Sequence, residues 1–229
     1  MSNDVSMDQP LRDPRLAFFS GLLGYLEDRK WALERVCTAP HGSNLFDLRV
    51  SHRLYFQSLL SAIDHVRDFL QDRKDLLDRF DAAIRNGNDY FEYVRELRNA
   101  VLHRGLDLVG AAHSDNHTLS VICPRDIENQ RRTKIFQPPF KYLRELAAYC
   151  ESVCNPAVTE VLTALGLFDP ATHIVGNDHF ETFIRTNPDI PEVIKDSAIA
   201  QMRSLSPGVF ADMAADRVHR MKVLLGLES

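Results

Sequence analysis

The sequence predicts a mainly α-helical protein, with a small β-hairpin inserted between helices and a helical extension near the C-terminal end. Apolar residues recur at intervals of three and four over most of the chain, which is typical of helices that bury one face. Pro and Gly residues separate these segments, and only one short region alternates as a strand does. The chain has 229 residues, 45% of them hydrophobic, which suffices for a sizeable core without disulfides.

The first two helices are the longest that the pattern predicts. The first begins at Asp13-Pro14, because Asp caps free backbone N–H groups and Pro is tolerated at the first helical position, and it ends before Pro40. The second covers about residues 44–72, and residues 74–85 continue it as a short helix.

A third helix follows a break at residues 86–88, where Asn and Gly accept the left-handed backbone geometry that ends helices. Asp89 and Glu92, three positions apart, resemble a capping box at its start. We expect this helix to end near His103, with Gly105 as its exit.

The rest of the chain is expected to hold the hairpin and the extension. The strand-like segments are 106–112 and 118–123, and helices are predicted at 141–153, 156–165, 180–185, 191–205 and 207–225. We therefore expect three parts: a flexible tail (1–13), a helical domain (14–169) and a helical extension (170–229) that can pack on the same core.

Composition narrows the functional classes. No apolar run approaches the roughly 18 residues of a membrane span, and the polar start lacks the features of a secretory signal, so we expect a cytoplasmic protein. The net charge of −5 argues against a protein that coats nucleic acid by bulk electrostatics. The nucleotide-binding signatures G-x-x-x-x-G-K-[ST] and G-x-G-x-x-G do not occur, nor does H-E-x-x-H.

No cofactor and no metal site is expected. The four cysteines contain no C-x-x-C pair, and Cys150 and Cys154, four apart on a predicted helix, are expected to pack as small hydrophobic side chains. His113 and His117 flank the hairpin turn, but the sequence offers no third ligand beside them.

The end of the third predicted helix carries residues suited to catalysis: Arg98, Asn99 and His103. Asn99 and His103 share one face, whereas Arg98 lies about 140° around and about 7.5 Å along the axis from His103, within reach of a long side chain. A neutral imidazole can take the proton of an RNA 2′-hydroxyl while a guanidinium stabilises charge on the phosphorus oxygens. Asn99 can orient either group.

The R-N-x-x-x-H spacing of these three residues resembles the signature of the HEPN superfamily, and the helix order is similar over roughly residues 14–165. The resemblance implies a HEPN-like antiparallel helical bundle, often a homodimer with two motifs facing each other across the interface. It further implies a metal-independent endoribonuclease that leaves a 2′,3′-cyclic phosphate and acts as a toxin or as a phage-defence or stress effector. A protein antitoxin or another regulator would then be a further partner.

Two details of the resemblance concern neighbouring residues. Members that a nucleotidyltransferase silences often carry Tyr two residues after the His, where this chain has Gly105, so that regulation is not expected. A polar residue of the preceding long helix commonly supports such sites, and Ser61, Asp64 and His65 are candidates.

Other interpretations of the motif and of the basic stretch also fit the sequence. The chain can be a non-catalytic HEPN-like module that binds RNA or a protein partner, or His103 can simply cap the last carbonyls of its helix. Basic residues exceed acidic ones over 124–145. The candidate RNA contacts are Arg104, Arg131, Arg132 and Lys134, with Phe136, Phe140 and Tyr142 interleaved. The competing interpretation is a solvated loop whose aromatic residues belong to the core, where Trp31 and Phe18-Phe19 are also expected.

Overall fold

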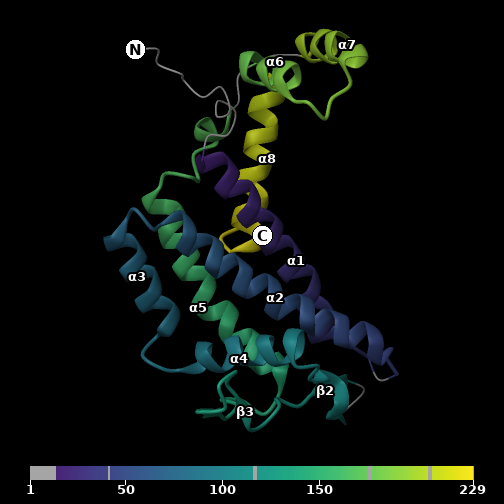
Figure 1. Ribbon diagram of the computed structural model, residues 1–229, viewed down its shortest axis with the longest axis vertical. Helices are drawn as coiled ribbons and strands as arrows, with labels where there is room; N and C mark the ends of the chain where they lie inside the picture. Colours follow the sequence, from purple (N-terminus) through teal and green to yellow (C-terminus); the bar gives the residue numbers. More distant parts are fainter. Residues whose placement is uncertain (1–13, 41, 116–117, 175–176, 206–207, 229) are drawn as a thin grey trace.

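The computed structural model of the chain describes residues 14–40, 42–115, 118–174, 177–205 and 208–228. It is mainly helical, which confirms the predicted fold class (Figure 1). The helices are α1 (Pro14–Thr38), α2 (Leu45–Phe69), α3 (Lys74–Arg85), α4 (Tyr90–His103), α5 (Leu143–Ala164), α6 (Asn177–Thr186), α7 (Glu192–Arg203) and α8 (Gly208–Leu224). The strands are β1 (Ala112–Asp115), β2 (Thr118–Val121), β3 (Ile127–Glu128) and β4 (Ile135–Phe136).

Helices α1 and α2 form an antiparallel pair that crosses the middle of the molecule (Figure 1). Each has 25 residues, and each buries an apolar face spaced by three and four positions. These faces supply the centre of the core, and their fully buried members include Phe19, Leu22, Leu26, Leu59, Ile63 and Val66. Phe18 is buried as expected, but Trp31 is 44% exposed at the surface of α1, where the Arg35 guanidinium lies over its ring, so the prediction that Trp31 packs in the core is wrong.

Helix α5 is one continuous helix, although two helices separated near residue 155 were expected. Pro156 lies inside it and removes one backbone N–H donor. The side chains on either side of this position, Cys154 and Ala157 among them, are buried in the core. Tertiary packing therefore overrides the local preference of Pro to end a helix.

A buried polar network joins α1, α2 and α5. The Arg29 guanidinium, 2% exposed, lies 3.2 Å from Glu151 Oε1 and donates to Asn155 Oδ1 at 2.5 Å. The Tyr55 hydroxyl donates to Glu151 Oε1 at 2.9 Å, and burial raises the pKa of this phenol well above its ordinary value. Because each charge has a partner, the network can sit inside an apolar core.

Helix α4 begins and ends where the sequence predicts, but the capping is different. Asn88 Oδ1, and not the Asp89 side chain, accepts the hydrogen bond of a first-turn N–H, that of Tyr90 at 3.0 Å. The expected capping box of Asp89 and Glu92 is therefore wrong. Gly105, with φ of 71°, provides the left-handed residue just after the helix.

The hairpin is shorter than predicted. Strands β1 and β2 pair in antiparallel register, Ala112 opposite Val121. The turn was predicted at Ser114-Asp115-Asn116, but Ser114 and Asp115 belong to β1, and Asn116 and the flanking His117 lie outside the described residues. Residues 108–110 form a 3-10 turn instead of the expected strand, because Leu108 and Val109 are both buried and a strand would place neighbouring side chains on opposite faces. A second small pair, β3 with β4, was not predicted.

The C-terminal extension divides into two parts. Helix α8 contributes Val218 and Met221 to the main core, so its second half packs on the helical domain. Helices α6 and α7 pack on each other and project away from the bundle at the top of Figure 1, near the beginning of α8. In the described ranges no helix is both long enough and apolar enough to cross a membrane.

Candidate functional site

The three predicted catalytic residues lie on the second half of α4, where this helix packs beside α2. Leu97 and Ala100 of α4 are buried in the core and fix the rotation of the helix. The neighbouring positions Arg98 and Asn99 are consequently half-buried, and His103, at the last helical position, is exposed. The helix thus presents one guanidinium, one amide and one imidazole outside the core.

Arg98 lies in a narrow crevice between α2 and α4. The crevice holds about 10 Å³, close to the minimum for one water molecule, and Arg53, Phe56, Leu102 and Leu108 also line it. The Arg98 side chain keeps 26% of its surface exposed. Its Nε atom is buried and has no hydrogen-bond acceptor among the residues that the structure describes. Such an orphaned donor costs about 1–3 kcal/mol unless a ligand or water completes it.

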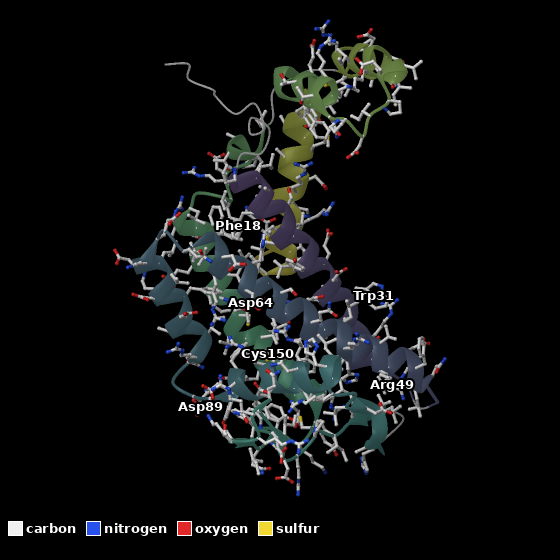
Figure 2. All side chains as sticks on the ribbon, in the orientation of Figure 1. Phe18, Trp31, Arg49, Asp64, Asp89 and Cys150 are labelled. Atoms are coloured by element: carbon white, nitrogen blue, oxygen red, sulfur yellow. The ribbon has the colours of Figure 1, made fainter. Side chains whose placement is uncertain are left out.

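Asp64 of α2 is the carboxylate nearest to this guanidinium. Its Oδ2 atom lies 3.9 Å from an Arg98 terminal nitrogen, too far for a hydrogen bond but close enough to orient the charge. Figure 2 shows Asp64 near the middle of the molecule, on α2. Of the other two candidates on α2, His65 contacts the Phe18 carbonyl of α1, and Ser61 is half-buried.

Arg98 and His103 do not meet within one chain. Across the described part of the chain, no hydrogen bond or ion pair joins the two side chains, and neither the Asn99 nor the His103 side chain has a polar partner. The expected contact between the guanidinium and the imidazole is therefore not observed within a single copy. Arg98 lies beside Asp64 of α2, whereas His103 is exposed at the end of α4.

Arg104, a predicted RNA contact, forms hydrogen bonds and an ion pair within the chain. Its guanidinium donates to the backbone carbonyls of Glu128 and, at 3.1 Å, of Glu96. It also lies 3.6 Å from the Glu96 carboxylate. Arg104 thereby ties the end of α4 to β3.

Two residues of the predicted basic surface pair with acidic neighbours. Lys134 Nζ donates to Glu92 of α4 at 2.7 Å, which raises the pKa of the lysine, and Arg132 lies 3.5 Å from Glu128. Arg131 is exposed, and no ion pair to it is found in the described ranges. Glu128 belongs to the same stretch, so of these two contacts only that with Glu92 brings a negative charge to it from outside.

The aromatic residues of that stretch were expected either to stack on RNA bases or to belong to the core, and they do not all behave alike. Phe136 and Phe140 pack against the core, as the loop interpretation expects. Tyr142 is half-buried, and Lys141 and Arg144 lie over its ring at 4.8 and 5.3 Å.

The described residues contain no cluster of three His, Cys, Asp or Glu side chains that could hold a metal ion. Cys150 and Cys154 are buried and free, and burial raises the pKa of both thiols, as expected for cysteines that pack as hydrophobic residues. His113 is exposed on β1, while His117 lies outside the described residues.

Sequence reasoning missed Arg53, which faces the same crevice as Arg98. Arg53 shares a stripe of α2 with Asp64, about 20° away around the helix but about 16.5 Å away along its axis. The crevice therefore has two arginines in its lining, and Asp64 lies beside one of them, Arg98.

We compared the chain with protein-family models, with curated proteins and with solved structures, and none of the three comparisons gave a match.

Proposed function

We propose that the chain is a metal-independent endoribonuclease of the HEPN type that acts as a homodimer. The observation that carries the proposal is the Arg98 guanidinium, whose side chain is 26% exposed and whose terminal nitrogen lies 3.9 Å from the nearest carboxylate, that of Asp64, too far for a hydrogen bond. A phosphate oxygen is the acceptor that a guanidinium fork fits best. The accessible His103 on the same helix supplies the group that can move protons.

In the proposed reaction, neutral His103 takes the proton of a ribose 2′-hydroxyl, and the 2′-oxygen attacks the adjacent phosphorus. Arg98 stabilises the additional charge on the phosphorus oxygens, and Asn99 orients the reacting groups. The bond from phosphorus to the 5′-oxygen breaks, and this oxygen leaves with a proton that an imidazolium can return. The products are a 2′,3′-cyclic phosphate and a 5′-hydroxyl.

The homodimer is part of the proposal because one copy does not complete the site. Arg98 turns toward Asp64, whereas His103 lies on the open surface at the end of α4. Two copies related by a twofold axis would place Arg98 of one beside His103 of the other.

Cleavage tests the first half of the proposal. Purified protein is incubated with end-labelled single-stranded RNA in EDTA, and we expect fragments with cyclic phosphate ends. His103→Ala and Arg98→Ala should each lower the rate about 100-fold or more. His219→Ala on α8, where the imidazole pairs with Glu228, serves as the control and should cut normally. Activity that persists in both motif variants would remove the proposed mechanism.

A mixing experiment tests the second half. Arg98→Ala and His103→Ala chains are unfolded and refolded together, so that about half of the dimers are mixed and each mixed dimer has one intact site. We expect recovery to about a quarter of the normal rate. A site contained within one chain would give no recovery.

The second candidate function is a non-catalytic helical module that binds RNA or a protein. The separation of Arg98 from His103 within one chain favours it. It predicts no cleavage, together with salt-dependent RNA binding that Arg131→Gln and Arg132→Gln weaken. Because Arg132 already pairs with Glu128, the effect of Arg131→Gln should be the larger.

A further inference from the structure

A second arginine-lined cavity lies at the opposite end of α4 from His103. It is a cleft of about 320 Å³ between α2, the end of α3 and the first turn of α4. Asp89, labelled in Figure 2, lies on the loop at its edge. The cleft has an apolar floor and a charged rim. The floor residues are Leu60, Ile63, Ile84 and Phe91, and the rim includes Arg67, Arg85 and Arg95.

The three arginines differ in their partners. Arg67 pairs with Asp81 at 2.7 Å and with Asp64 at 3.5 Å. Arg85 and Arg95 are exposed, and in the described part of the chain neither side chain has a hydrogen bond or an ion pair. The cleft therefore has one neutralised arginine and two that are free to bind an anion.

The acidic residues of the rim do not cancel this charge. Glu92 already binds Lys134 Nζ at 2.7 Å, so its charge is neutralised from outside the cleft. Asp89 is the one remaining carboxylate among the residues that line the cleft, against the two free guanidinium groups. The first turn of α4 forms part of the wall, and its positive dipole end adds to the attraction for an anion.

We propose that this cleft binds a nucleotide, with its phosphate on Arg85 and Arg95 and its base against the apolar floor. Two guanidinium forks suit a phosphate, and the volume lies at the small end of the about 300–1,000 Å³ that is usual for ligand pockets. The nucleotide can be free or part of a single-stranded RNA. Arg95 is about 12 Å along α4 from His103, so an RNA strand bound here can extend toward the proposed site of cleavage.

The proposal is tested by calorimetric titration of the whole chain with AMP, with inorganic phosphate and with a short 2′-O-methyl RNA. The modified RNA lacks the attacking hydroxyl, so binding is measured whether or not the protein cleaves RNA. We expect AMP and RNA to bind, and phosphate alone to bind more weakly because it cannot use the apolar floor.

Variants of the two free arginines assign the binding to the cleft. Arg85→Gln and Arg95→Gln should each weaken binding about tenfold, because each removes a charge-assisted contact. Arg79→Gln is the matched control, since Arg79 lies on α3 like Arg85 but pairs with Glu160 of α5. Arg85→Lys and Arg95→Lys should weaken binding less, because they keep the charge and lose the fork. Thermal melts establish that each variant is folded.

The outcomes separate the two sources of the nucleotide. If AMP and RNA both depend on the two arginines, the cleft takes a free nucleotide; if RNA alone does, it takes a nucleotide within a strand. The proposal is overturned if binding is unchanged in Arg85→Gln and Arg95→Gln. It is also overturned if none of the three probes binds at millimolar concentration. The titrations do not require cleavage, so they remain informative even if the unchanged chain does not cut RNA, and the two proposals fail separately.

Discussion

Two glycines of α1 provide a sharp test of how α1 packs on α2. Gly21 and Gly24 both lie in the interior of this helix, where Ala is normally preferred by about 1 kcal/mol. A Cβ atom at Gly24 would meet nothing within 4 Å. A Cβ atom at Gly21 would lie 2.8 Å from Nε2 of His65 on α2.

The His65 ring cannot easily move aside. Its Nε2 atom is 3.0 Å from the Phe18 carbonyl, and the ring stacks on Phe18 at 5.2 Å and meets the Tyr25 ring edge-on at 5.6 Å. Displacing it breaks a hydrogen bond worth about 1 kcal/mol and adds overpacking of about 1–3 kcal/mol. After the gain in helix propensity, we expect Gly21→Ala to destabilise the fold by about 1–2 kcal/mol.

Urea unfolding followed by circular dichroism measures both variants. Gly24→Ala should raise the free energy of unfolding by about 0.5–1 kcal/mol, so the pair should differ by about 2–3 kcal/mol. In a His65→Ala background the obstacle is gone, and Gly21→Ala should then stabilise the fold as Gly24→Ala does. If Gly21→Ala stabilises the otherwise unchanged chain, the described contact between α1 and α2 is refuted.

Three further predictions concern buried groups. Burial lowers the pKa of His52 from 6.5 to about 4 despite its hydrogen bond to the Leu48 carbonyl, so the unfolded chain binds the proton more readily between these values. The free energy of unfolding should therefore fall by about 2 kcal/mol from pH 7 to pH 5, and His52→Leu should flatten that slope in urea titrations. Arg29→Met should cost about 3–5 kcal/mol, since it strands the Glu151 carboxylate, and adding Glu151→Leu should recover part of the loss; equal stability of the single and double variants would contradict the pairing. Of the four thiols, Cys37 is exposed and the other three are buried, so a thiol reagent should modify Cys37 in the native protein and the others after unfolding.

The local order of the chain was predictable because it depends on neighbouring residues. The start of α1 at Pro14, the end of α3 before Gly87 and the end of α4 before Gly105 follow from the backbone preferences of Pro and Gly. The apolar spacing likewise identified the buried faces of α1 and α2. The same local preferences and apolar spacing were sufficient to place Arg98, Asn99 and His103 at the end of one helix.

The partners of the charged side chains could not be predicted in the same way. Arg98 is 34 positions from Asp64, its ion-pair partner, and Lys134 is 42 positions from Glu92. Which acidic residue a guanidinium or ammonium group meets depends on how the helices pack, and periodicity along one helix contains no information about that. For this reason the tertiary structure, and not the sequence, decided that Lys134 and Arg132 pair with acidic residues and that Arg98 lies beside Asp64 while His103 of the same chain is exposed.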